Sequence, residues 1–210
     1  MKTRIMTLHR GGLEKAHLDE AVEILAAGGV AAYPTETFYG LGGSAESAAA
    51  VENIFRLKGR DRSQALPLIA SDVEMVGTWV RRPGPKFEIL VRTFWPGPLT
   101  LVLKASKAVP EHIRGPGGSV ALRVPPLDWL RRLVRRLGVP LIATSANPSG
   151  HGGFSDPDSV RAHFGGRIDL IIDGGETEGR RPSTILDLTG KNPALLREGA
   201  VSREDLAAFL

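Results

Sequence analysis

Short apolar runs alternate with segments of helical periodicity, and this alternation most restricts how the 210-residue chain can fold. Several apolar runs also follow one another with no helical segment between them. This pattern predicts an α/β fold with a twisted mixed sheet, parallel and antiparallel, flanked by helices. Strands are expected at 1–8, 29–33, 66–70, 99–104, 120–124, 140–144, 170–173, 183–188 and 194–197. Helices are expected at 18–27, 44–58, 72–80, 87–94, 127–137, 159–164 and 202–210.

Glycine and proline lie at the ends of these predicted elements and do not form a linker. The 25 glycines and 15 prolines interrupt no long stretch of uniform composition, and no internal repeat is present. Residues 1–210 are therefore predicted to form a single domain.

Charge and composition narrow the class of protein. The net charge of +4 and the sequence pI of about 9.7 favour anionic partners such as phosphates, nucleotides or RNA. The absence of cysteine excludes disulfides, thiolate catalysis and cysteine–zinc sites. The first residues show no signal-peptide pattern, and no apolar stretch reaches the roughly 20 residues of a membrane span. We expect a cytoplasmic protein without membrane contact.

Several common sites are missing from the sequence. It contains neither GxxxxGK[ST] nor GxSxG, and its histidines lack metal-ligand spacing, so we expect no metal held by protein ligands alone. Residues 40–45 match GxGxx[GA] but begin six residues after Pro34, which ends the preceding strand. A dinucleotide fold is therefore disfavoured, and we expect these glycines to let the backbone approach a ligand closely.

Four polar clusters remain as candidate sites. They are the loop 34-PTETFYGLGG-43, the basic turn 58-KGRDR-62, Arg123 in an apolar strand, and 144-TSANPSG-150 after another strand. Each has a structural alternative: a polar turn, cations offsetting a helix dipole, a salt bridge, or a strand-capping turn. Together they predict an anion-binding cleft that works by positioning and charge neutralisation, without a nucleophile or a carboxylate pair.

The order and spacing of these motifs resemble the YrdC family. The likeness runs from about residue 18 to the C-terminus and rests on PTETFYGLGG, KGR, WPGPLTLVL, SVALRVP, TSANPSG, STILDL and REGAVS. The resemblance implies a short single-domain form with a deep basic cleft. It also implies an L-threonylcarbamoyladenylate synthase, which makes threonylcarbamoyl-AMP and pyrophosphate from L-threonine, bicarbonate and ATP with Mg²⁺. A downstream transferase complex would then modify tRNA.

The resemblance also assigns roles to individual residues. The phosphate- and bicarbonate-handling set would be Lys58, Arg60, Ser145 and Asn147. L-threonine would contact Thr35, Arg123 and Ser183. The nucleotide would contact Lys58, Arg60, Ser119, Ser145 and Arg197. Lys58 and Arg60 are expected at the cleft surface, so that their loss should affect turnover more than stability.

Two departures from the family pattern stand out. Ser71 occupies a position where some relatives place a histidine that contacts threonine, and Arg62 lies in a loop that differs from the family version. Two other functions remain open. One is an RNA-binding module using Arg131, Arg132, Arg135 and Arg136 on the helix expected at 127–137. The other is a YrdC-like paralogue that binds a nucleotide but performs a different transfer.

Overall fold

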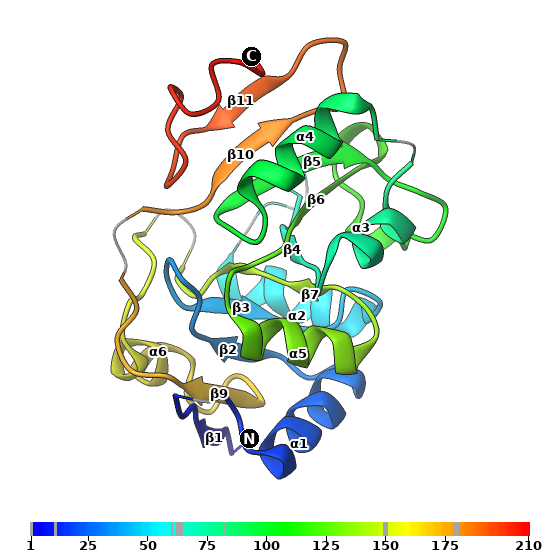
Figure 1. Ribbon diagram of the computed structural model, residues 1–210. Helices are drawn as coiled ribbons and strands as arrows, with labels where there is room; N and C mark the ends of the chain where they lie inside the picture. Colours follow the sequence, from blue (N-terminus) through cyan, green and yellow to red (C-terminus); the bar gives the residue numbers. More distant parts are fainter. Residues whose placement is uncertain are drawn as a thin grey trace.

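The computed structural model describes residues 2–10, 12–59, 61, 65–81, 83–148, 151–178 and 181–210. Two mixed sheets organise the described chain (Figure 1). The first sheet has the order β1 (Arg4–Thr7), β9 (Leu170–Asp173), β2 (Ala31–Tyr33), β3 (Gly40–Gly42) and β8 (Thr144–Ser145). The second has the order β11 (Ala194–Arg197), β10 (Thr184–Asp187), β5 (Leu99–Lys104), β6 (Ser119–Arg123), β4 (Leu68–Ile69) and β7 (Leu141–Ile142).

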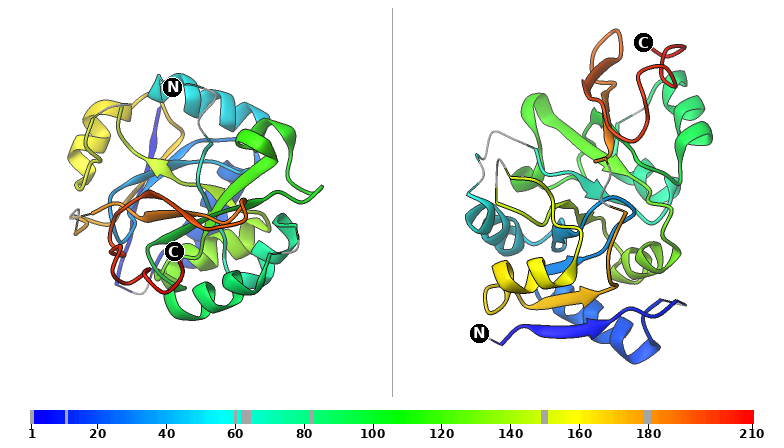
Figure 2. Two further views of the ribbon diagram at one scale, coloured as in Figure 1. Left: turned by 90° about the horizontal axis from the view of Figure 1, so that it is seen from above. Right: turned by 90° about the vertical axis from the view of Figure 1, so that its left-hand side faces the viewer.

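Both sheets combine parallel and antiparallel pairs, which confirms the predicted α/β class. In the first sheet β2 pairs parallel with β9 and antiparallel with β3. In the second, β10 pairs parallel with β5 and antiparallel with β11. The first sheet lies at the end of the molecule that carries the N-terminus, and the second lies towards the C-terminus (Figures 1 and 2).

Helices flank both sheets and begin and end close to the predicted positions. They are α1 (Lys15–Ala26), α2 (Ala48–Lys58), α3 (Val73–Trp79), α4 (Pro85–Phe94), α5 (Asp128–Leu137) and α6 (Pro157–Phe164). The ends of α2 follow the capping signals in the sequence. The Ser47 hydroxyl accepts the Ala50 N–H at 3.2 Å, and Gly59 adopts the left-handed conformation at φ 58°. No described helix is long and apolar enough to cross a membrane.

Two groups of buried apolar side chains form the core. The larger runs through both sheets and the helices that cover them, and includes Leu41, Leu101 and Leu122. The smaller packs α1 and α5 against the first sheet, through side chains such as Leu25 and Leu133. Burial of this apolar surface, at about 25 cal/mol per Å², stabilises the stacking of the elements.

The prediction of one continuous strand at 140–144 is wrong, because two separate strands, β7 and β8, occupy this part of the chain. Its first half, β7, pairs with β4 in the second sheet, whereas β8 pairs with β3 in the first. Between them, the Ala143 N–H donates to the Pro67 carbonyl at 2.8 Å. One apolar run therefore passes from one sheet to the other, because its partners come from distant parts of the chain.

The loop predicted at 34–43 contains an additional strand, β3, whose glycines belong to the sheet and do not begin a helix. A Cβ on Gly42 would lie 1.7 Å from the Ile142 carbonyl oxygen, so only glycine fits there. The glycines were expected to let the backbone approach a ligand closely. At Gly42 the close approach is instead to the backbone of another strand, β7.

The helix predicted at 202–210 is also wrong, since consecutive turns occupy this segment. Ser202 and Asp205 make the expected capping contacts, with the Asp205 N–H donating to the Ser202 hydroxyl at 3.1 Å. Hydrogen bonds such as Phe209 N–H to Leu206 O then span three residues. The buried Leu206 anchors this segment to the core without a helix.

Candidate active site

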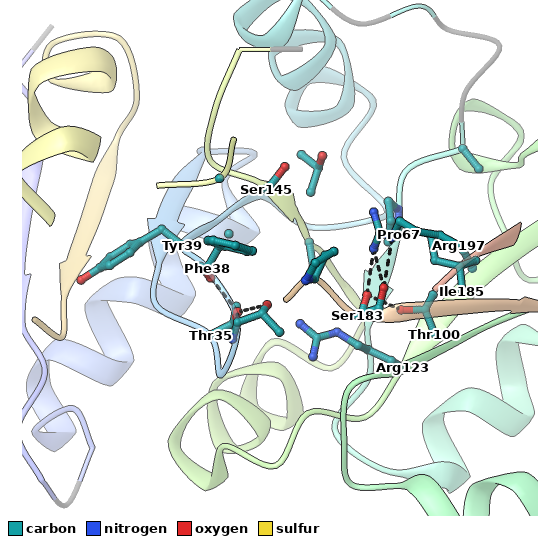
Figure 3. A pocket seen from close by; sticks show the side chains of 18 of the residues that line it. Thr35, Phe38, Tyr39, Pro67, Thr100, Arg123, Ser145, Ser183, Ile185 and Arg197 are labelled. Carbon is teal, nitrogen blue, oxygen red and sulfur yellow. Dashed lines mark hydrogen bonds between the residues drawn. The ribbon is translucent and has the colours of Figure 1, made fainter. Parts of the chain in front are cut away.

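A cavity of about 490 Å³ lies between the two sheets and receives side chains from both (Figure 3). The loop after β2 and the strand β8 line it from the first sheet, whereas β5, β6, β10 and β11 line it from the second. This cavity brings together five of the predicted site residues, which are Thr35, Arg123, Ser145, Ser183 and Arg197.

Arg123 is the buried cation of the cavity. It ends β6 with 6% of its surface exposed, and its guanidinium points into the cavity (Figure 3). Burial lowers the pKa of Arg123 to about 10, and the positive charge of Arg197 acts in the same direction. Arg123 is therefore still charged at neutral pH. The Glu36 carboxylate pairs with it, so the salt bridge anticipated as an alternative does form.

Arg197 and Ser183 form a second polar group on the same side of the cavity as Arg123, since β6, β10 and β11 belong to the second sheet. Arg197 donates from Nη2 to the Ser183 carbonyl at 2.8 Å and to the Ser183 hydroxyl at 3.2 Å. Thr100 donates from Oγ1 to the same hydroxyl at 3.0 Å. These contacts, drawn in Figure 3, hold an exposed arginine beside a row of hydroxyls where an anionic ligand can be bound.

Thr35 stabilises the loop that faces these arginines. Its Oγ1 donates to the Phe38 carbonyl at 2.6 Å and accepts the Thr37 N–H at 3.2 Å. Tyr39 fixes the far end of the loop by donating to the Gly175 carbonyl at 2.8 Å. Burial raises the pKa of Tyr39 to about 12, so its hydroxyl stays protonated. The turn is thus rigidly set, with Thr35 on the cavity wall.

Lys58 does not lie at the cleft surface, which corrects that expectation. It is 4% exposed at the end of α2, and it is not among the described residues lining the cavity. Its Nζ donates to the carbonyls of Ser145 and Asn147, and to Asn147 Oδ1 at 3.3 Å. A buried ammonium needs such acceptors to offset its desolvation. Lys58 and Asn147 therefore hold the turn that presents Ser145 to the cavity.

Other expected residues have different places. Ser119 is buried and donates to the Pro116 carbonyl at 2.8 Å, and it is not among the described residues that line the cavity. Ser71 is buried as well and donates to Asp72 Oδ2 at 2.9 Å beside the cap of α3. Arg60 and Arg62 lie outside the described residues. The structure thus gathers part of the predicted set, and the remaining assignments stay predictions.

The sequence interpretation missed part of the wall. Val102, Ile185 and Leu196 give it an apolar side, and Leu196 is 58% exposed. The segment 151–153 also lines the cavity, and its HGG sequence signals a loop that can approach a ligand. Arg123 and Arg197 are the permanent cations of the described lining, which contains no carboxylate. The deep basic cleft that the resemblance implies stays a prediction.

The arginines of α5 are paired with acidic residues on the surface. Arg131 and Arg132 contact Asp128 at 2.7 and 3.8 Å, whereas Arg135 contacts Asp72 at 3.2 Å and Arg136 contacts Asp19 at 2.6 Å. Such pairs are typical of a solvated helix face. They reduce the positive field that an RNA surface would need.

The mixed α/β fold and its two-sheet cavity place the chain in a known class. Residues 23–199 match the model of the Sua5/YciO/YrdC family, whose description reads "Telomere recombination". The chain belongs to this family, as the sequence motifs predicted.

Curated relatives with the same printed name support this membership. A "Threonylcarbamoyl-AMP synthase" of Pyrococcus abyssi is 38% identical over 197 residues, which cover 94% of this chain and 58% of the relative. One of Thiobacillus denitrificans is 42% identical over 168 residues, covering 80% of this chain and 89% of the relative. The chain thus spans little more than half of the first relative and most of the second.

Solved structures agree with the fold. Sua5 of P. abyssi complexed with L-threonine has a TM-score of 0.92 at 36% identity, covering 99% of this chain and 61% of that one. YciO of E. coli has a TM-score of 0.90 at 30% identity, covering 99% of this chain and 100% of that one.

Proposed function

We propose that this chain is a threonylcarbamoyl-AMP synthase, a nucleotidyltransferase that uses L-threonine, bicarbonate and ATP. The observation that carries the proposal is the convergence of Arg123 and Arg197 with the hydroxyls of Thr35, Ser145 and Ser183 around one cavity. A carboxylate, a carbamate and a triphosphate are all anions, and a site for them needs fixed cations and hydrogen-bond donors. The names of two relatives and the threonine complex of a third support this substrate set.

The residues suggest a division of the cavity between substrates. Arg123 is a planar fork suited to the threonine carboxylate, with Thr35 beside it. Arg197 and Ser183, on the same side of the cavity as Arg123, suit the nucleotide phosphates, and Ser145 faces the cavity from the first sheet (Figure 3). This arrangement would place the threonine amino group in the middle of the cavity.

The chemistry follows from this placement. Bicarbonate yields carbon dioxide and hydroxide. The neutral amino group adds to the carbon dioxide and its proton passes to the hydroxide, so that the products are a carbamate and water. A carbamate oxygen then attacks the α-phosphorus of ATP, and pyrophosphate leaves with the electron pair of the broken P–O bond. The protein contributes orientation and charge neutralisation, which together can supply much of such a rate enhancement.

Mg²⁺ fits this site as part of the nucleotide. The described lining offers hydroxyls but no carboxylate, so Ser145 and Ser183 could contact a metal held mainly by phosphate oxygens and water. Such an ion would neutralise phosphate charge. The roles of Lys58, Arg60, Asn147 and Ser119 in phosphate or nucleotide handling belong to the same proposal. The proposal also includes delivery of the product to a threonylcarbamoyl transferase complex that acts on tRNA. It further includes a cytoplasmic location, where these partners would be found.

Pyrophosphate release tests the function directly. The protein is incubated with ATP and Mg²⁺, with and without L-threonine and bicarbonate, and with L-serine in place of threonine. We expect release that requires both co-substrates and is weak with serine. Release that does not depend on threonine would contradict the proposal.

A second candidate is a family member that binds a nucleotide but performs a different transfer. The match to YciO along the full length of both chains favours keeping it, because the same fold and length accommodate a protein not named for this activity. ATP binding without threonine-dependent pyrophosphate release would favour this candidate.

A further inference from the structure

Glu36 forms an ion pair with Arg123 that joins the two sides of the cavity. Glu36 lies on the loop after β2 of the first sheet, and Arg123 ends β6 of the second. Their side chains are only 15% and 8% exposed. The Glu36 carboxylate is therefore paired with the guanidinium of Arg123. In the proposed function, this same guanidinium binds the carboxylate of L-threonine.

This pairing uses only half of the Glu36 carboxylate. Oε1 accepts from Arg123 Nη1, whereas the buried Oε2 accepts no hydrogen bond from any residue that the structure describes. A buried acceptor without a donor is not compensated for its lost hydration. A substrate carboxylate that engages the guanidinium of Arg123 with both oxygens would form the bidentate pair that Glu36 does not form.

A second cavity can accommodate the side chain of Glu36 after its displacement from Arg123. It measures about 410 Å³, and its lining includes Glu36, Thr37, Glu178 and Arg181. Glu36 is thus paired with Arg123 of the first cavity and also borders a neighbouring space whose lining includes the guanidinium of Arg181. This space offers its carboxylate an alternative position.

We propose that Glu36 competes with the substrate carboxylate for Arg123 and thereby sets the affinity and selectivity for the amino acid. This inference rests on the proposed function, which places the threonine carboxylate at Arg123. The exchange replaces one carboxylate by another, so Arg123 keeps a counter-charge in both states. An amine without a carboxylate cannot displace Glu36 and is disfavoured at the site.

Competition of this kind weakens apparent affinity by the fraction of molecules in which Glu36 blocks the site. Glu36→Gln keeps the shape of the side chain but removes the charge that competes for Arg123. We expect Glu36→Gln to lower the dissociation constant for L-threonine by about threefold or more. Isothermal titration calorimetry on the whole chain, with L-threonine as the titrant, measures this constant.

Glu88→Gln is the matched control. Glu88 is exposed on α4 and carries the same charge, but it is not among the described residues that line either cavity, and no described ion pair joins it to Arg123. Its substitution should leave the threonine dissociation constant unchanged. Equal gains in both variants would contradict competition at Arg123, since a general loss of negative charge would then explain them.

Glu36→Asp provides a second test if Glu36→Gln folds poorly. Its shorter side chain weakens the pairing but keeps the charge, so we expect a smaller gain in affinity. Unchanged or weaker threonine binding in a folded Glu36 variant, with normal binding by the wild-type protein, would overturn the inference alone. If the wild-type protein does not bind L-threonine, the proposed function is overturned, and this inference with it.

Discussion

The Nζ of Lys58 donates to the Asn147 carbonyl at 2.8 Å and thereby ties the end of α2 to the turn after β8. Because Nζ also donates to the Ser145 carbonyl, one buried ammonium supports the turn that carries two predicted site residues. The KGR motif therefore has a structural task beneath the cavity in addition to any role with phosphates.

Replacement of Lys58 should reduce both stability and activity. Lys58→Met preserves length and removes the described donor of the buried Asn147 carbonyl, which costs about 1–3 kcal/mol. Urea unfolding followed by circular dichroism measures the loss, and pyrophosphate release measures activity. The exposed Lys107 supplies the control, because Lys107→Met should change stability by less than about 0.5 kcal/mol. Equal stability of the two variants would contradict a supporting role for Lys58.

Arg123→Ala should raise the KM for L-threonine far more than the KM for ATP. A charge-assisted hydrogen bond contributes about 1.5–3 kcal/mol, which corresponds to roughly ten- to hundredfold in affinity. Steady-state pyrophosphate release, with each substrate varied in turn, separates the two constants. An unchanged threonine KM would show that Arg123 does not bind the carboxylate.

Loss of Arg123 should also expose its pairing with Glu36. Arg123→Met leaves the carboxylate of Glu36 buried without its counter-charge, and breaking such a pair costs about 3–5 kcal/mol. Adding Glu36→Gln to Arg123→Met should recover a large part of that stability. Chemical unfolding of the single and double variants gives the coupling between the two residues, and additive effects would contradict it.

Gly42→Ala should destabilise the protein by about 1–3 kcal/mol or more, because the added methyl group overlaps the Ile142 carbonyl and forces β3 away from β7. Gly77→Ala is the natural control. Its Cβ would meet nothing within 4 Å, and Gly77 lies inside α3, where alanine is favoured by about 0.5–1 kcal/mol. Thermal unfolding of both variants should therefore show shifts of opposite sign.

The cap of α6 should contribute to acid sensitivity. Asp156 Oδ1 accepts the Ser159 N–H at 2.7 Å, and this hydrogen bond holds the pKa of Asp156 below its usual value. A lowered folded-state pKa gives stability that is present above the unfolded pKa of about 3.9 and is lost as pH falls through the folded value. The stability difference between wild type and Asp156→Asn should shrink between neutral pH and about pH 3. A constant difference in unfolding experiments would contradict this.

Much of the local structure could be predicted from the sequence. Ser47 and Gly59 mark the two ends of α2, and the apolar spacing along 127–137 indicates the buried face of α5. These signals act through hydrogen bonds and packing within a few residues, so the order of residues is enough to reveal them. The capping contacts of Ser202 show the limit, since they form without a helix.

The sequence by itself determined the α/β class, the helices from α1 to α6 and the family motifs, several of which mark the cavity. Tertiary structure alone decided that the run at 140–144 divides between two sheets, because its strand partners β4 and β3 are distant in the chain. It also decided that Lys58 is buried against the turn after β8 and that Glu36 forms an ion pair with Arg123. Such contacts depend on which segments meet after folding, and long-range packing fixes them where local patterns cannot.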